Sequence, residues 1–167
     1  VPGHVLDVLA ASAVTEVTML GRRGPAYARF TTKELRELGE ISGSDIIVDP
    51  ADLELTEQEE ADVAADRTLR ANLEVLREWS TRTPEGRPRR LRIKFWLRPV
   101  EVLGSAAVTG FRAERTRLEN GRLVGTGSIL DFPAQLVLRS VGYRVVPPAG
   151  LPLDPETGTV PHDGGRV

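Results

Sequence analysis

The sequence predicts an α/β protein, in which a parallel sheet carries packed helices and is followed by an antiparallel meander. Two observations lead to this class. In the first half of the chain, short apolar runs alternate with segments of helical period, which favours parallel strands joined by helices. Near residue 90 the apolar period changes from about 3.6 to about 2, which is typical of half-exposed strands. The 167 residues, 40% of them hydrophobic, can furnish the core of one domain.

Apolar spacing and chain-breaking residues predict the elements of the first half. Residues 4–11 are predicted as a short helix, and Glu16–Leu20 as a buried strand rich in β-branched and apolar residues. The breaker cluster at 21–25 must then be a loop. A second helix begins near residues 31–32, and residues 45–49 are predicted as a second buried strand. The inward-facing residues of the second helix are expected to be Leu35, Leu38 and Ile41.

A long third helix is predicted from about residue 56 to residue 81. One buried stripe at helical spacing supports it, formed by Ala61, Ala65, Leu69, Leu73 and Leu76. The acidic residues of its first turn are favourable at a helix N-terminus and need no catalytic role. They are Glu57, Glu59 and Glu60. Four further acidic residues flank strands and turns, and we assign them to solvation and turn formation: Asp45, Asp49, Asp52 and Glu54.

The second half of the chain is predicted as strands. Residues 90–98 form a half-exposed strand, because apolar side chains alternate there with mainly basic ones. Further strands are expected at 100–103, 107–118 and 123–129, with Asn120-Gly121 as a hairpin turn between the last two. Residues 135–142 are predicted as a closing buried strand.

The predicted order is therefore β-α-β, a long helix, an antiparallel meander and a closing strand. A meander in place of a helical crossover before a final parallel strand is typical of the nucleotide domains of flavoproteins that bind two dinucleotides, an analogy at the level of fold. We therefore expect a Rossmann-like nucleotide-binding domain over residues 1–146, with residues 147–167 as a tail.

Composition excludes several kinds of site. The chain has no cysteine, which excludes disulfides, thiolate metal sites, iron–sulfur clusters and a cysteine nucleophile. Its two histidines, His4 and His162, are far apart in the sequence, so neither a histidine zinc site nor a Ser/His/Asp triad is expected. With 22 basic and 24 acidic residues, the net charge of −2 disfavours a general nucleic-acid binder. No targeting or membrane-spanning segment is visible, and we expect a cytoplasmic protein.

Two adjacent arginines, Arg22 and Arg23, follow the strand Glu16–Leu20 with no carboxylate beside them. In a dinucleotide-binding sheet the residue at this strand end meets the adenosine ribose. An acidic residue there selects NAD, whereas arginine accommodates the 2′-phosphate of NADP. Guanidinium groups suit a phosphate because they stay charged and present a planar fork of donors. From the residues alone, the alternative is a solvated loop with two surface arginines.

The segments VTMLGRRGP at 17–25 and FTTKELREL at 30–38 resemble the NADP-binding segment of adrenodoxin-reductase-type ferredoxin–NADP reductases. LVLRSVGY at 136–143, GLP at 150–152, GTVP at 158–161 and GGRV at 164–167 resemble later segments of the same family, in the same order. The resemblance implies an oxidoreductase that uses FAD to move electrons between NADP(H) and a small acidic iron–sulfur protein of the ferredoxin type. From the near-neutral charge and the lack of a long apolar run, we expect no nucleic-acid partner and no membrane span.

Carried over residue by residue, the resemblance implies that Arg22 and Arg23 bind the 2′-phosphate of NADP. It also implies that Glu34 contacts the adenosine side of the cofactor. From the residues alone, the segment 31–34 is a capping box, in which Glu34 bonds back to the amide of Thr31. The two roles of Glu34 can coexist, because a helix N-terminus is favourable beside a bound phosphate.

The sequence departs from the family before its first strand. A glycine fingerprint for the pyrophosphate should precede Glu16–Leu20 on its own strand and helix, but only Gly3 lies upstream. The flanking FAD-binding domain and the closing Gly-Trp segment of the family are not in the sequence either. We therefore expect most of an NADP-binding domain that lacks its first β-α unit. Its tail leads back toward the FAD-binding domain, and without flavin the portion is not expected to act alone.

A basic segment at residues 82–98 suggests a rival hypothesis. Its cations are interleaved with Phe95 and Trp96, and three interpretations stay open: a solvated strand face, a docking surface for an acidic electron carrier, and a single-stranded nucleic-acid site. The rival is thus a cofactor-free interaction module that binds an acidic protein or RNA. The basic residues of the segment are Arg82, Arg87, Arg89, Arg90, Arg92, Lys94 and Arg98.

Overall fold

The computed structural model describes residues 1–142, 146, 149–154 and 158–166. It divides into two units, Val1–Gln135 and Leu136–Val167, and each is described by itself. Residue 147, at the predicted boundary between residues 146 and 147, lies outside the described ranges. So do Tyr143 and Val167, which belong to the segments that resemble the family. Within the described ranges, no helix is both long enough and apolar enough to span a bilayer.

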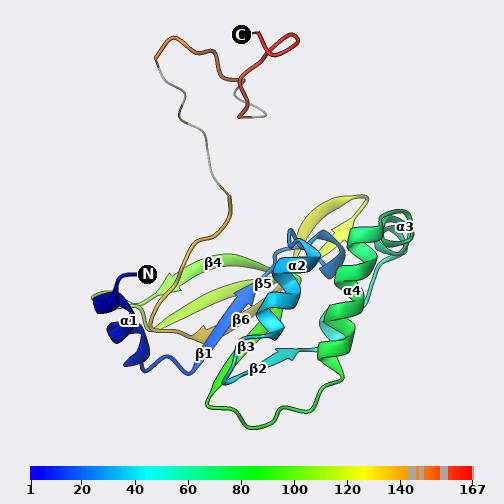
Figure 1. Cartoon of the computed structure of the whole chain (residues 1–167). Helices are drawn as coiled ribbons and strands as arrows, with labels where there is room; N and C mark the ends of the chain where they lie inside the picture. The colour runs from blue at the N-terminus through cyan, green and yellow to red at the C-terminus, as the bar shows by residue number, and fades with distance from the viewer. Residues whose placement is uncertain (143–145, 147–148, 155–157, 167) are drawn as a thin grey trace. The chain divides into compact units, whose positions relative to one another are not determined.

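A parallel sheet of three strands forms the centre of the first unit, which confirms the predicted arrangement (Figure 1). The strands are β1 (Glu16–Leu20), β2 (Ser44–Val48) and β3 (Arg89–Lys94), in the order β1-β3-β2. β3 lies in the middle, with Ile93 opposite Met19 on β1 and opposite Val48 on β2. Because all three strands run in the same direction, their carboxyl ends lie along one edge of the sheet.

Helices α2 (Thr32–Gly39) and α4 (Arg67–Ser80) supply the main core against this sheet. The core is formed by Leu35, Val48, Leu53, Val75, Leu76, Trp79, Ile93 and Phe95. Leu35 is fully buried as predicted, but α2 ends at Gly39, and the inward position predicted for Ile41 is wrong, because its side chain is 46% exposed. Helix α1 (Gly3–Ala10) forms where predicted and contributes no buried residue.

The long third helix is two helices, so the prediction of one continuous helix is wrong. α3 (Glu57–Ala65) ends where the backbone of Asp66 becomes extended, and the Asp66 carboxylate then accepts hydrogen bonds from the amides of Thr68 and Leu69 at the start of α4. The break rotates the buried face. Val63 is buried on α3, whereas the predicted Ala61 and Ala65 are exposed.

The predicted strand at 90–98 is also divided, between β3 and β4 (Leu97–Leu103). The alternation of burial is as predicted, but the first part lies at the centre of the parallel sheet and only the second part begins the meander. Trp96 separates them with a φ of 59°, a left-handed conformation that is uncommon for a bulky residue. This turn redirects the chain from one sheet to the other.

The antiparallel sheet has the order β4-β5-β6, with β5 (Gly110–Glu119) and β6 (Arg122–Pro133) as a long hairpin. Asn120 and Gly121 form the predicted turn, with φ values of 50° and 74°. Positive φ at both central residues is what a tight two-residue hairpin turn requires, and it explains the Asn-Gly pair.

Residues 135–142 form no strand, so the predicted closing strand is wrong. Leu136 and Leu138 are 68% and 80% exposed. The β-branched and apolar residues of this segment show only that its side chains would suit a pleated surface. A strand also needs the edge of another strand to pair with. Among its described residues, the second unit has a bridge between Asp163 and Arg166 as its one ladder contact.

Candidate functional site

The predicted site residues Arg22 and Arg23 lie directly after β1, at the carboxyl edge of the parallel sheet. Three other segments meet this loop there: the short helix η1 (Pro25–Tyr27), the β3–β4 junction at Trp96, and the middle of β5. Open α/β sheets bind ligands outside the carboxyl ends of their strands. The arginine pair therefore occupies the position at which such a sheet binds its ligand.

The backbone of this loop is fixed on both sides by hydrogen bonds. The Gly21 amide donates to the carbonyl of Lys94 at 2.8 Å, and the Gly21 carbonyl accepts from the amide of Leu97 at 3.0 Å. The Arg23 carbonyl accepts from the amide of Trp96 at 3.2 Å. Between them, the Arg22 carbonyl accepts from the Thr116 hydroxyl at 2.7 Å. The chain is thus held rigidly at the residues whose side chains are free to reach a ligand.

Both arginine side chains are exposed, and in the part of the chain that the structure describes neither guanidinium is within 4.0 Å of a carboxylate. Most arginines of the two sheets have a carboxylate within 4.0 Å, whereas in the described loops and helices arginines without one are common. Two adjacent guanidinium groups on a fixed backbone are chemically suited to a doubly charged anion. The arrangement favours the phosphate interpretation over that of a solvated loop.

Arg23 lies against the ring of Tyr27, with its Cζ 5.7 Å from the ring centroid. The Tyr27 hydroxyl donates to Oδ2 of Asp62 on α3 at 3.0 Å. Burial and this hydrogen bond raise the pKa of Tyr27, so the phenol stays protonated as a donor. Sequence reasoning missed Tyr27, whose only signal is its place two residues after the GRRGP motif.

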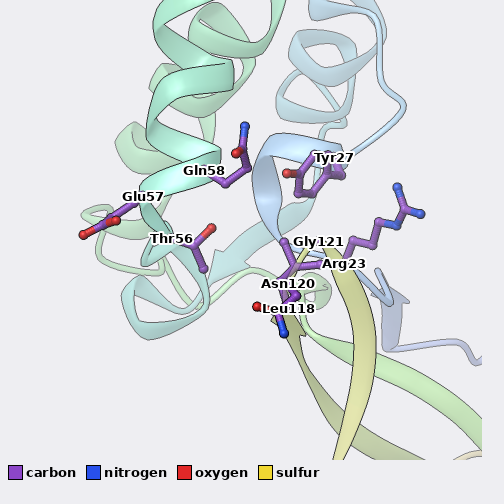
Figure 2. Close-up of a pocket in the computed structure, with 8 residues that line it drawn as sticks. All are labelled: Arg23, Tyr27, Thr56, Glu57, Gln58, Leu118, Asn120 and Gly121. Atoms are coloured by element: carbon purple, nitrogen blue, oxygen red, sulfur yellow. The ribbon is translucent and has the colours of Figure 1, made fainter.

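A cleft of about 460 Å³ opens beside this pair, between η1, the start of α3 and the β5–β6 turn (Figure 2). In Figure 2 the Arg23 guanidinium points away from Thr56 and Gln58, which lie on the far side of Tyr27. The lining residues are Arg23, Tyr27, Thr56, Glu57, Gln58, Leu118, Asn120 and Gly121.

Gly24 closes the loop against a buried acid. A Cβ at Gly24 would lie 2.0 Å from Oε1 of Glu59 and 2.3 Å from the Trp96 ring, so no larger residue fits. Glu59 is fully buried, and its Oε2 accepts from the amide and the hydroxyl of Thr56, both at 3.0 Å. Burial raises the pKa of Glu59 above its ordinary value, despite these donors. The predicted role of Glu59 at the helix N-terminus is confirmed. Glu59 also packs against Gly24 in the loop at residues 21–25, which we call the arginine loop.

Glu34 forms the predicted capping box. Its Oε2 accepts from the Thr31 amide at 2.9 Å and from the Thr31 hydroxyl at 2.8 Å, and the Glu34 amide donates to that hydroxyl at 3.2 Å. These hydrogen bonds lower the pKa of Glu34, which keeps it ionised. The side chain is exposed, so the capping contacts leave the rest of the carboxylate accessible.

The basic segment at 82–98 is largely neutralised within the molecule. Six of its seven cations have a carboxylate within 4.0 Å in the described structure, the partners being Glu78, Asp45, Glu85, Glu16, Asp52 and Glu114. Lys94 is only 24% exposed. Because most of these charges are paired, and because they are spread over the loop after α4, β3 and β4, they do not form the single basic face that the rival hypothesis requires.

Two acidic residues assigned to solvation are buried instead. Asp45 is 7% exposed, and it accepts hydrogen bonds from the amides of Glu85, Gly86 and Arg87 at 3.1, 3.0 and 2.9 Å. Asp52 is 2% exposed and is paired with Arg115. Their partners are distant in the sequence, so local turn rules could not identify them. Within the described ranges, no three His, Asp or Glu side chains are grouped as metal ligands.

We compared the chain with known proteins by sequence and by structure. No family model matches the sequence. The chain is 43% identical over 169 residues to the NADPH-ferredoxin reductase FprA of Mycobacterium leprae, and 35% identical over 177 residues to the mitochondrial NADPH:adrenodoxin oxidoreductase of Arabidopsis thaliana. Each alignment covers 98% of this chain and 37% of the relative, so the chain spans just over a third of their length.

The fold agrees with the sequence comparison. A solved structure described as Mycobacterium tuberculosis FprA in complex with NADPH superposes with a TM-score of 0.86 at 40% identity, over 99% of this chain and 37% of that chain. A probable ferredoxin/ferredoxin–NADP reductase of Mycobacterium leprae is 40% identical over 162 residues. By sequence and by fold, the chain is homologous to one segment of the adrenodoxin-reductase-type ferredoxin–NADP reductases.

Proposed function

We propose that this chain is the NADP(H)-binding portion of an FAD-dependent ferredoxin–NADP reductase, with Arg22 and Arg23 holding the 2′-phosphate of the cofactor. The observation that carries the proposal is a pair of guanidinium groups on a fixed backbone at the carboxyl end of β1, with no carboxylate of the described residues within 4.0 Å. The NADPH complex of the homologous FprA structure supports the same ligand.

The arginine pair would select NADP over NAD. A 2′-phosphate carries close to two negative charges, and two adjacent guanidinium groups can contact it from different sides. A free 2′-hydroxyl offers them no charge, and there is no carboxylate directly after β1 to accept its hydrogen bond. The fixed carbonyls of Gly21, Arg22 and Arg23 reduce the ordering cost of binding, because only the side chains need to adjust.

Glu34 is proposed to contact the adenosine side of the cofactor while it caps α2. Only one of its oxygens, Oε2, takes part in the capping bonds, so Oε1 is left as an acceptor. An acceptor at this place suits a sugar hydroxyl or an exocyclic amine, both of which donate hydrogen bonds.

The whole protein is proposed to be an oxidoreductase in which this portion binds and orients NADP(H). A flavin such as FAD supplies the conversion between hydride transfer and single-electron transfer, and it would be bound by another part of the parent enzyme. Residues 1–146 are proposed as the NADP-binding portion, and residues 147–167 as the connection back to the FAD-binding domain.

The electron-transfer partner is proposed to be a small iron–sulfur protein of the ferredoxin type, as the names of the homologues suggest. An acidic partner is the finer part of this proposal. A rate of ferredoxin reduction that falls as ionic strength rises would support it, because screening weakens attraction between opposite charges. A rate that is independent of salt would contradict it.

Binding of 2′,5′-ADP to the intact protein tests the cofactor site. Calorimetry should show that 2′,5′-ADP binds more tightly than 5′-AMP, and that Arg22→Ala/Arg23→Ala removes most of this preference. The matched control is Arg77→Ala/Arg82→Ala, which removes the same charge from the exposed surface at the end of α4. Unchanged preference in the Arg22/Arg23 variant would overturn the assignment of the 2′-phosphate.

A further inference from the structure

The strongest unassigned feature beside the proposed site is the contact between Arg23 and Tyr27. The Arg23 guanidinium lies over the Tyr27 ring, with 5.7 Å between Cζ and the ring centroid. A guanidinium over an aromatic face is held by electrostatic attraction, and its in-plane N–H groups stay available to an anion. The ring can therefore orient Arg23 without using the donors that a phosphate needs.

Tyr27 itself is fixed from the other side. Its hydroxyl donates to Oδ2 of Asp62 at 3.0 Å, and Oδ1 of Asp62 accepts from the Gln58 side chain at 2.9 Å. Asp62 and Gln58 are one turn apart on α3, so the ring is tied to a helix outside the arginine loop. Ala26, the residue before Tyr27, is buried in a small core with Val63 and Leu73.

These contacts form a chain from helix α3 to the arginine loop. Asp62 holds the hydroxyl of Tyr27, and the ring of Tyr27 holds the guanidinium of Arg23. Arg22 has no such support among the described contacts, although both residues share the fixed backbone. The two arginines are therefore not equivalent: one is held in place by a ring, and the other is free to adjust.

We propose that Tyr27 is a positioning residue that orients Arg23 toward the 2′-phosphate and so increases the selectivity for NADP(H) over NAD(H). The inference deepens the proposed function and depends on it. An arginine that is already oriented loses less side-chain freedom when a phosphate binds. The advantage should appear only with ligands that carry the 2′-phosphate, because the Tyr27 ring acts through Arg23.

The test is the ratio of the affinities for 2′,5′-ADP and 5′-AMP, measured by calorimetry on the intact protein. Tyr27→Leu removes the ring and is expected to lower this ratio about two- to fivefold, which corresponds to about 0.5–1 kcal/mol for an exposed cation–π contact. Tyr27→Phe keeps the ring and should retain most of the ratio. A purely structural role would instead weaken the binding of both ligands alike.

A double-mutant cycle separates action through Arg23 from other effects. In an Arg23→Ala background, Tyr27→Leu is expected to leave the ratio unchanged, because the side chain that it positions is gone. A ratio that Tyr27→Leu does not change in the wild-type background would overturn the inference, and so would an equal loss in the Arg23→Ala background.

Together with Arg22→Ala/Arg23→Ala, these variants distinguish the role of Tyr27 from the proposed function. If Arg22→Ala/Arg23→Ala leaves the preference for 2′,5′-ADP intact, the proposed function fails and this inference fails with it. If the arginine variant loses the preference and Tyr27→Leu does not alter it, only the role of Tyr27 is wrong. Thermal unfolding of each variant should show that it is folded at the temperature of the binding measurement.

Discussion

Asp45 organises a loop that has no regular secondary structure of its own. Its two carboxylate oxygens accept hydrogen bonds from three consecutive backbone amides, those of Glu85, Gly86 and Arg87, about 40 residues further along the chain. Burial alone would raise the pKa of Asp45, but the three amides outweigh it and lower the pKa below its ordinary value of 3.8. The charged form is therefore the one that holds the loop before β3.

We expect Asp45→Asn to destabilise the protein at neutral pH, because an amide group offers one acceptor where the carboxylate offers two. Since the pKa of Asp45 is lowered on folding, its stabilisation is present above its ordinary pKa and is lost as pH falls through the lowered value. Urea unfolding should thus show a difference between the wild type and the variant that is constant near neutrality and shrinks in acid. Asp7→Asn, on exposed α1, is the control.

A second residue-scale prediction separates the two roles of Glu34. Thr31→Ala removes the capping hydroxyl but leaves the Glu34 carboxylate in place, whereas Glu34→Ala removes the carboxylate half of the capping box and with it the proposed contact to adenosine. Both variants should lower the melting temperature, because each loses capping bonds of α2. Only Glu34→Ala should also weaken the binding of 2′,5′-ADP. Equal affinities in the two variants would restrict Glu34 to its capping role.

The residues of the site differ in how far the sequence can predict them. Arg22 and Arg23 are predictable, because their signal is local: two cations directly after an apolar strand. Thr116, which fixes the Arg22 carbonyl, lies 94 positions away in the middle of β5, where its neighbours give no sign of that contact. The sequence therefore predicts the side chains that we propose to contact the ligand, whereas the residues that hold their backbone in place depend on the fold.

At the scale of elements, one side chain decides whether α3 and α4 are one helix. The apolar spacing continues across residue 66, and the spacing alone predicted a continuous helix. Asp66 instead leaves the helical conformation and uses Oδ1 to accept from the amides of Thr68 and Leu69 at 2.6 and 3.2 Å. Aspartate competes with helix interiors in this way because its short side chain reaches nearby backbone amides.

We expect Asp66→Ala to lower the free energy of unfolding by about 0.5–2 kcal/mol, the usual cost of losing an N-cap. The two amides at the start of α4 would lose their acceptor, and alanine would favour continuation of α3. Urea denaturation followed by far-UV circular dichroism measures the change. Glu74→Ala, in the exposed interior of α4, is the control, and a loss no larger than in this variant would contradict the capping role.

The predicted strand at 90–98 is also divided by contacts that apolar spacing does not show. The alternation through residues 90–98 is real, yet the positive φ of Trp96 divides it between two sheets, because the Trp96 amide binds the Arg23 carbonyl and its own carbonyl accepts from Thr116. Periodicity reports which side chains are buried, and it does not report which strand lies alongside. Element type was therefore predictable over most of the first 133 residues, while breaks and partners required the tertiary contacts.

At the scale of the whole first unit, the two sheets are joined at the carboxyl edge where the proposed site lies. Asp52 lies on the short helix η2 (Pro50–Leu53) that follows β2. It is 2% exposed and pairs with Lys94 at the end of β3 and with Arg115 on β5, at 3.7 and 3.1 Å. Thr116, the next residue on β5, donates its amide to the Trp96 carbonyl at 2.8 Å. One buried carboxylate thus connects the end of the parallel sheet to the antiparallel sheet.

We expect Asp52→Ala to lower the free energy of unfolding by about 1–3 kcal/mol, because two cations lose their shared carboxylate. Removing one partner of a fully buried ion pair costs about 3–5 kcal/mol, because the other charge is left without a partner and without water. The loss for Asp52→Ala should be smaller than that. Lys94 and Arg115 have side chains that are 24% and 40% exposed, so each can recruit solvent. Urea unfolding followed by tryptophan fluorescence and by far-UV circular dichroism tests this expectation.

The two probes report on the joint between the sheets in different ways. Fluorescence reports on Trp96 at the junction and on Trp79 in the core on α4, whereas circular dichroism follows the helices and strands of the whole unit. If Asp52 ties the sheets into one cooperative structure, the two transitions coincide in the wild type. In Asp52→Ala, either the two midpoints separate or both shift to a lower urea concentration. Glu54→Ala removes an exposed carboxylate two residues away and should leave both midpoints unchanged. Equal behaviour of the two variants would show that the sheets are held by packing and backbone hydrogen bonds alone.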